Sequence, residues 1–230
     1  MKEYPILFSA PMVRANRSGL KRMTRRIVTV PWHKGKRCLP YEPYFEDVDG
    51  VLHCTDKYGD SHVFADVRTS PYGEPGDKIW VRETWADINS YGEAAIAYKA
   101  GNDTVYFVGS PHENGIFLVD DSVLEPYSFA VWGDDLFSGS SKGWHLSIHM
   151  PRWASRDVYT VTGVRVERLQ AITEADAMAE GIEAEYSRFD FPPRMAFSML
   201  WDSINGKRPG HTWKDNPWVW VVEYDNPACK

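Results

Sequence analysis

Two segments in the last third of the chain have the pattern of sheet strands and constrain the fold most strongly. Residues 158–166 (VYTVTGVRV) and 218–224 (WVWVVEY) are rich in β-branched and aromatic residues and contain no proline. In the second segment, Trp218 and Trp220 alternate with valines, which indicates structural packing of the indoles. Gly163 interrupts the first segment and indicates a bend or bulge there. The fold must therefore contain an extended sheet.

Most other patterned segments also favour strands. Thr173 has the character of a helix N-cap, with carboxylates in the turn that follows, and this helix should run to Glu180 and stop at Gly181. The remaining expected elements are strands at 6–9, 23–30, 78–83, 94–98 and 104–108, a hairpin around 51–53 and 62–64, and helices at 12–18 and 194–204. Because strands dominate, the pattern predicts a mostly β, barrel-like α+β domain with a few short helices.

Length and composition favour a globular, intracellular protein. The chain has 230 residues, 43% of them hydrophobic, which is enough for one domain with a real core. It contains no run of about 18 apolar residues, so we expect no membrane span. The N-terminus lacks the build of a signal peptide, and the three cysteines (Cys38, Cys54 and Cys229) are scattered. Both features favour the cytoplasm and reduced thiols.

Charge is distributed unevenly along the chain. The net charge is −6, yet residues 14–37 contain nine Lys or Arg and no Asp or Glu, so the rest of the chain carries −6 − 9 = −15. Charge runs most often form a solvated helix face. Here the absence of acidic residues within the run favours an anion-binding site instead.

Within this basic segment, Lys21 and Thr24 are candidates for chemistry. Three residues apart, they would share a face of a helix but point to opposite faces of a regular strand. Both can serve one site only if Lys21 lies in a turn and Thr24 at the start of the next strand. The alternative is a basic hairpin in which the threonine only favours a strand.

Glu180 is the second candidate. A carboxylate in the last turn of a helix faces the negative end of the helix dipole, which costs about 0.3–1 kcal/mol when the group is exposed. Beside a lysine, Glu180 would become a candidate acid or base with a raised pKa. The alternative is an exposed glutamate screened by solvent.

Three motifs in order along the chain resemble the ASCH domain family, a branch of the PUA-like barrels. They are Gly19-x-Lys21-x-x-Thr24-x-Arg26, Gly76-Asp77-x-Ile79-x-Val81, and Leu169-x-x-Ile172-Thr173-x-x-x-Ala177-x-x-Glu180-Gly181. The resemblance covers roughly residues 5–30, 73–85 and 155–225. It implies a single domain spanning 1–230 with insertions at 32–70 and 86–150. The segments at 147–156 and 216–218 are similar to ASCH proteins encoded by phages and prophages, which would place the protein in a bacterial host.

The resemblance implies a cleft that accepts RNA or a modified nucleoside. In members that hydrolyse N4-acetylcytidine the active set is a lysine, a threonine and a glutamate, which here are Lys21, Thr24 and Glu180. The implied reaction is amide hydrolysis, with Lys21 as base, Thr24 as nucleophile and Glu180 as acid. Other members are ribonucleases or RNA-binding modules, so the family does not determine the reaction. Positive charge for the substrate would come from Arg14, Arg22, Arg25 and Arg26.

A second basic and aromatic segment could contact RNA through phosphates and stacked bases. Its candidate residues are His149, Arg152, Trp153 and Arg156. The alternative is a packed loop. Cys38, His53, Cys54 and His62 lack the spacing of a zinc site, so we expect neither a metal nor a cofactor. A third function class is a phage accessory protein that works through protein contacts. The sequence does not indicate the oligomeric state.

Overall fold

The computed structural model describes residues 1–29, 32–33, 36–37, 51–55, 61–101, 105–108, 111–112, 115–116, 121–182 and 191–229. The chain divides into two compact units. The first contains residues 1–2, 18–78 and 160–230, and the second contains residues 3–17 and 79–159. The first unit thus includes the expected insertion at 32–70, and the second includes the one at 86–150. The candidate residues Lys21, Thr24 and Glu180 all belong to the first unit.

Three antiparallel strands form the sheet of the first unit. β15 (Trp218–Asp225) lies between β14 (Val158–Arg168) and β2 (Met23–Ile27). Both strands expected from their composition, 158–166 and 218–224, are confirmed. The register of β14 against β15 shifts between Val161 and Gly163, so the irregularity indicated by the glycine is also confirmed.

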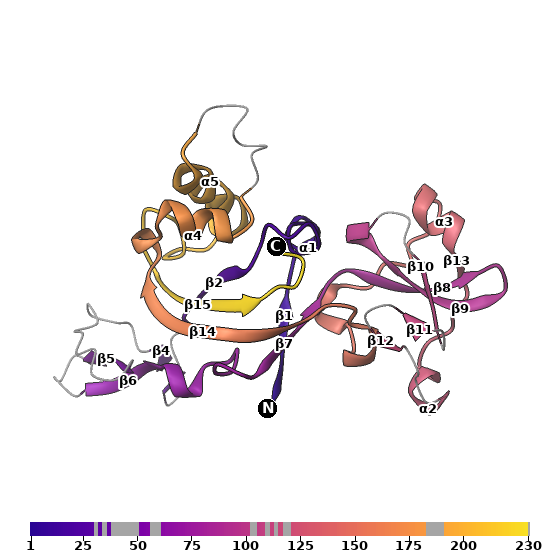
Figure 1. Cartoon of the computed structure of the whole chain (residues 1–230), viewed down its shortest axis with the longest axis horizontal. Helices are drawn as coiled ribbons and strands as arrows, with labels where there is room; N and C mark the ends of the chain where they lie inside the picture. The colour runs from indigo at the N-terminus through magenta and orange to yellow at the C-terminus, as the bar shows by residue number, and fades with distance from the viewer. Residues whose placement is uncertain are drawn as a thin grey trace. The chain divides into compact units, whose positions relative to one another are not determined.

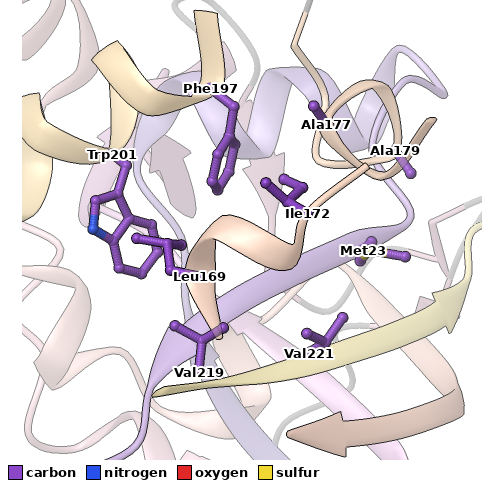
Figure 2. Packing of buried hydrophobic residues seen from close by; sticks show 9 residues of the cluster. All are labelled: Met23, Leu169, Ile172, Ala177, Ala179, Phe197, Trp201, Val219 and Val221. Atoms are coloured by element: carbon purple, nitrogen blue, oxygen red, sulfur yellow. The ribbon is translucent and has the colours of Figure 1, made fainter. Parts of the chain in front are cut away.

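One face of this sheet is covered by α4 (Glu174–Ala179) and α5 (Pro193–Asn205), which lie together on the same side of β14 and β15 (Figure 1). Figure 2 shows Phe197 and Trp201 of α5 packed with Leu169 above Val219 of β15. Such burial of large apolar side chains contributes about 1.5–3 kcal/mol each. The full cluster consists of Met23, Leu169, Ile172, Ala177, Ala179, Phe197, Trp201, Val219 and Val221.

The opposite face of the sheet carries the alternate side chains. Trp220 of β15 and Val28 pack there with Ala65 of β6 (Ser61–Asp66), and Trp218 lies against the same cluster. β6 pairs with β5 (Val51–Thr55) in the expected hairpin. The alternation of Trp218 and Trp220 with valines therefore has the expected cause, since the two sets of side chains enter different cores.

Local signals place the ends of α4. The Thr173 hydroxyl accepts a hydrogen bond from the Asp176 backbone N–H at 3.1 Å, as an N-cap should. The helix ends at Glu180, and Gly181 follows in the left-handed conformation with φ +84°. Such a residue after the last turn is the ordinary glycine stop. The position of Glu180 at the helix end is confirmed.

The second unit has its own sheet, in the order β10–β9–β8–β13, with β8 parallel to β13 and the other pairs antiparallel. β8 (Trp85–Ser90) was not expected from the sequence, although four of its first five residues are buried. Its polar residues masked the pattern. The strand tolerates the buried carboxylate of Asp87 because that carboxylate is hydrogen-bonded. It accepts from the Phe129 N–H at 3.1 Å and bonds His145 Nε2 at 2.6 Å.

The described residues form several sheets and short helices, which confirms the α+β class. Within these ranges the paired strands do not close into a barrel, so the PUA-like barrel remains a proposal. The other elements are β1 (Glu3–Leu7), α1 (Ala10–Arg17), β3 (Trp32–His33), β4 (Lys36–Arg37), β7 (Lys78–Arg82), β9 (Glu93–Tyr98), β10 (Val105–Phe107), β11 (Pro111–His112), β12 (Gly115–Ile116), α2 (Asp121–Leu124), β13 (Val131–Trp132) and α3 (Gly133–Ser138).

Candidate active site

Lys21 is a buried lysine, with 1% of its side chain exposed, in the segment that leads into β2. It forms an isolated antiparallel bridge with Glu180 at the end of α4. Its ammonium donates to Glu180 Oε2 at 2.7 Å, to the Glu180 carbonyl at 2.8 Å and to the Met23 carbonyl at 2.7 Å. An ammonium has three N–H donors, so these bonds can satisfy all of them.

Glu180 is also buried, with 4% of its side chain exposed. The alternative of a solvent-screened glutamate is therefore wrong. While Oε2 accepts from Lys21, Oε1 accepts from Arg25 Nη1 at 3.2 Å, so one carboxylate joins two buried cations. The Lys21 ammonium also contacts a carbonyl at the C-terminal end of α4, where positive charge is favoured.

Arg25 belongs to a wider ion-pair network rather than to an open cationic surface. Its side chain is fully buried, and Nη2 lies 2.6 Å from Glu167 Oε1 and 2.8 Å from Asp176 Oδ2. Arg165 contacts both of these carboxylates and also Glu223. The expectation that Arg25 contacts a substrate is corrected, because three carboxylates already surround it.

The expectation of unpaired positive charge at residues 14–37 needs the same correction for Lys21 and Arg17. Their acidic partners come from distant parts of the sequence: Glu180 for Lys21, and Asp157 for Arg17 at 2.8 Å in the second unit. Absence of acidic residues nearby in the sequence therefore did not mean absence of ion pairs. Arg14 and Arg22 are exposed, and Arg26 is partly exposed. Lys34 lies outside the described residues.

Thr24 and Arg26 lie on the face of β2 opposite to Met23 and Arg25, because side chains alternate along a strand. Thr24 is 1% exposed, and its hydroxyl has no hydrogen-bonding partner among the described residues. Lys21 precedes β2, and Thr24 is the second residue of that strand. This is the arrangement expected from the sequence if both residues serve one site. The structure thus joins Lys21 to Glu180 and leaves the Thr24 hydroxyl nearby in the chain without a bond to either.

Arg26 extends the polar environment on the Thr24 face. Burial lowers the pKa of Arg26 below its usual value, while the nearby Tyr72, Glu180 and Tyr224 oppose this shift. Tyr72 is itself affected, since burial raises the pKa of its phenol and Arg26 counteracts this. Sequence reasoning did not identify Tyr72 or Tyr224 as neighbours of the site, and no local motif marks them.

The titration of Lys21 should appear in the stability of the protein. Burial lowers the pKa of Lys21 from its usual 10.5, and Glu180 opposes the shift. Between the folded pKa and 10.5 the unfolded chain binds more protons, so the unfolding free energy rises with pH in this window. We expect Lys21→Met to remove this slope in urea denaturation at a series of pH values. Lys207→Met, at an exposed lysine, is the control. An unchanged slope in Lys21→Met contradicts the expectation.

The candidate residues of the second basic and aromatic segment lie in the second unit. Two of them, Arg156 and Trp153, are used in packing inside that unit. Arg156 pairs with Glu83 through two bonds of 2.8 and 3.0 Å, and its guanidinium lies 4.1 Å from the centre of the Tyr98 ring. With 3% of its side chain exposed, it presents no surface to RNA, which corrects that expectation. Trp153 packs edge-on against Trp85 in a buried aromatic cluster.

Arg152 and His149 remain accessible. Arg152 is exposed and pairs with Glu3 at 2.6 Å, and His149 is exposed. The pairing of Glu83 with Arg156 was missed, although the sequence carried a signal. In the strand expected at 78–83, Glu83 falls on the same side as Ile79 and Val81, so a buried carboxylate that needs a cation could have been inferred.

No protein-family model, no curated protein and no solved structure matches the chain. The resemblance to ASCH domains therefore rests on the motifs alone. Among the residues that the structure describes, no group of three or more His, Cys, Asp or Glu side chains could hold a metal ion. Cys38 lies outside these residues. None of the described helices is long and apolar enough to cross a membrane.

Proposed function

We propose that this chain is a PUA-like protein of the ASCH kind that hydrolyses the N4-amide of an acylated cytidine, with Lys21, Thr24 and Glu180 as its reacting groups. One observation carries the proposal. A buried lysine–glutamate pair adjoins a strand residue, Thr24, whose buried hydroxyl has no partner among the described residues. Buried polar groups are nearly always hydrogen-bonded, so an unpaired hydroxyl needs a reason, and a reacting group supplies one.

A purely structural role explains Arg25 better than it explains Lys21. Arg25 already links β2 to Glu167, Asp176 and Glu180, and so holds α4 against the sheet. A second buried cation adds a desolvation cost of several kcal/mol that the attachment of α4 does not require. Buried groups with perturbed pKa values and a specific charged partner are enriched at functional sites, and Lys21 has both features.

The pair can supply the acid and the base of amide hydrolysis. Transfer of one proton over 2.7 Å from Lys21 Nζ to Glu180 Oε2 converts ammonium and carboxylate into amine and carboxylic acid. Burial lowers the pKa of Lys21, which favours loss of this proton, since desolvation penalises the ammonium. The Lys21 amine then accepts the Thr24 hydroxyl proton as the oxygen bonds to the acyl carbon. Glu180 returns its proton to the departing N4 nitrogen as the C–N bond breaks.

A water molecule completes the cycle by hydrolysing the ester on Thr24, which releases the carboxylic acid and restores the hydroxyl. Arg26, on the same strand face as Thr24, supplies positive charge for the oxyanion. In the unliganded protein Thr24 is not bonded to Lys21, so the contact between the two must form when substrate binds. Catalytic hydrogen bonds often form only in the substrate complex.

The charge pattern favours a free nucleoside over a strand of RNA. Lys21, Arg25 and Arg17 all face carboxylates, and the net charge of the chain is −6. These three cations of the described residues are therefore not available to a phosphate backbone, whereas a nucleoside does not need them. If labelled RNA instead binds tightly and is released steeply by salt, the alternative of an RNA-binding module or ribonuclease is favoured.

Thr24→Val tests the proposal because it removes the hydroxyl and keeps the shape. We expect hydrolysis of N4-acylcytidines, followed by mass spectrometry, to be lost. The unfolding free energy should stay unchanged or rise by about 1 kcal/mol, since an unsatisfied buried group is removed. Thr29→Val, at an exposed position, is the matched control and should remain active. Full activity in Thr24→Val excludes the threonine nucleophile, and a wild type inactive on every acylated cytidine excludes the reaction.

A further inference from the structure

The residues after β15 fold back on the turn that carries Lys21. Asn226 is 3% exposed, and its Nδ2 donates to the Lys21 carbonyl at 2.8 Å. Residues 226–229 form a second turn with its own hydrogen bonds. Asn226 Oδ1 accepts from the Ala228 N–H at 3.1 Å, and the Asn226 carbonyl accepts from the Cys229 N–H at 2.8 Å. The side chain of Asn226 is thus held on one side and bonded to Lys21 on the other.

The main chain around Lys21 is also held from the other side. The Arg22 N–H donates to the Ala179 carbonyl at the end of α4 at 2.9 Å, and the Arg22 carbonyl accepts from the Tyr224 N–H at 3.1 Å. At Gly19 a Cβ atom would lie 2.0 Å from the Ala228 carbonyl oxygen. The peptide that carries Lys21 therefore lies between the end of α4 and the turn at 226–229.

We infer that Asn226 is a positioning residue, which fixes the Lys21 main chain so that its ammonium meets Glu180. Lysine has a long, flexible side chain, so a defined contact at its end requires a defined position of its backbone. The bond from Asn226 is made to the Lys21 carbonyl itself, and a side-chain amide is the donor. The inference rests on the proposed function in treating Lys21 as the reacting amine.

The test measures Lys21 directly and needs no substrate. The full chain is labelled with trace acetic anhydride over a range of pH, and mass spectrometry gives the labelling rate of each lysine. Exposed Lys207 is the internal reference. Asn226→Asp keeps the size of the side chain and the acceptor for the Ala228 N–H but loses the donor to Lys21. Asn226→Ala removes both.

In both variants we expect Lys21 to be labelled about tenfold faster relative to Lys207, because the lysine leaves its buried position more often when one hydrogen bond is lost. The pH midpoint of labelling should move toward 10.5, the ordinary value of lysine. Asn205→Asp is the matched control. It removes a side-chain amide bond, from Asn205 Nδ2 to the Trp201 carbonyl at 3.3 Å, in the same unit, and should leave Lys21 unchanged.

Three outcomes decide the inference. Faster labelling with a shifted midpoint in folded Asn226→Asp supports it, and Asn226→Ala should agree. Folded variants with the wild-type rate and midpoint overturn it, since the bonds of the ammonium to Glu180 and Met23 then hold the lysine without Asn226. Variants that do not fold also overturn it, because the role of Asn226 is then in the fold as a whole. A wild type that is inactive on acylated cytidines, with labelling of the variants as expected, would count against the proposed function and leave the positioning role intact.

Discussion

Glu180→Gln is expected to lower the unfolding free energy by about 3–5 kcal/mol, the cost of leaving a buried charge without its partner. Lys21 and Arg25 have 1% and 0% of their side chains exposed, and both donate to this one carboxylate. Water cannot replace the lost charge at buried Lys21, whereas Arg25 keeps Glu167 and Asp176. Activity on acylated nucleosides should be lost as well.

Urea denaturation measures the change, with Glu223→Gln as the control. Glu223 also pairs with an arginine of the first unit, but the side chains are 38% and 40% exposed, so this pair contributes only about 0–1 kcal/mol. Equal losses of unfolding free energy in the two variants would show that burial does not determine the cost of removing the Glu180 charge. That result would remove the main support for a charged pair at the centre of the proposal.

A double substitution separates stability from catalysis. Lys21→Met with Glu180→Leu replaces the pair by apolar side chains, and such replacements of buried ion pairs are often neutral or stabilising. Arg25 keeps Glu167 and Asp176 in this variant. The double variant should therefore be more stable than Glu180→Gln while remaining inactive.

Gly19→Ala is expected to have the second large effect. Gly19 has φ +76°, which costs an alanine about 1–2 kcal/mol, and the new Cβ would lie 2.0 Å from the backbone oxygen of Ala228. The backbone of the turn at 226–229 must move to relieve this contact, because no flexible side chain can give way. Overpacking of this kind costs about a further 1–3 kcal/mol.

Gly210→Ala is the matched control for Gly19→Ala. Its φ is +78°, and a Cβ there would have nothing within 4 Å, so the substitution tests the backbone conformation without the close approach. Thermal or urea denaturation of both variants gives the difference directly. If Gly19→Ala and Gly210→Ala lower the unfolding free energy equally, the close approach of Ala228 to Gly19 does not contribute to the cost of the substitution.

The two ion-pair systems around α4 thus have different expected consequences. Arg25, with Glu167 and Asp176, joins the sheet to the helix, and its loss should reduce stability. Lys21, held by Asn226 and paired with Glu180, is the group whose chemistry we propose. Thr24→Val distinguishes these roles, since it leaves both ion-pair systems in place.

Much of the fold could be predicted because its signals are local. The N-cap at Thr173, the glycine after Glu180, the irregularity at Gly163 and the alternation in residues 218–224 depend on neighbouring residues alone. These features determine where elements begin, end and face, and the structure has them where the pattern indicated. β8 was missed for the complementary reason, because its Asp87 is accommodated by partners outside the strand.

The sequence by itself thus determined the α+β class, the positions of the main strands and helices, and the placing of Lys21 before a strand and Glu180 at the end of a helix. Only the tertiary structure decided which charges meet. Lys21 and Glu180 lie 159 residues apart in the chain, and Arg25 and Glu167 lie 142 apart. Ion pairing depends on distance in space and on burial, which no count of nearby charges reveals. Arg17, Lys21 and Arg25, in a segment expected to be an open cationic surface, are therefore paired with carboxylates that lie far away in the sequence.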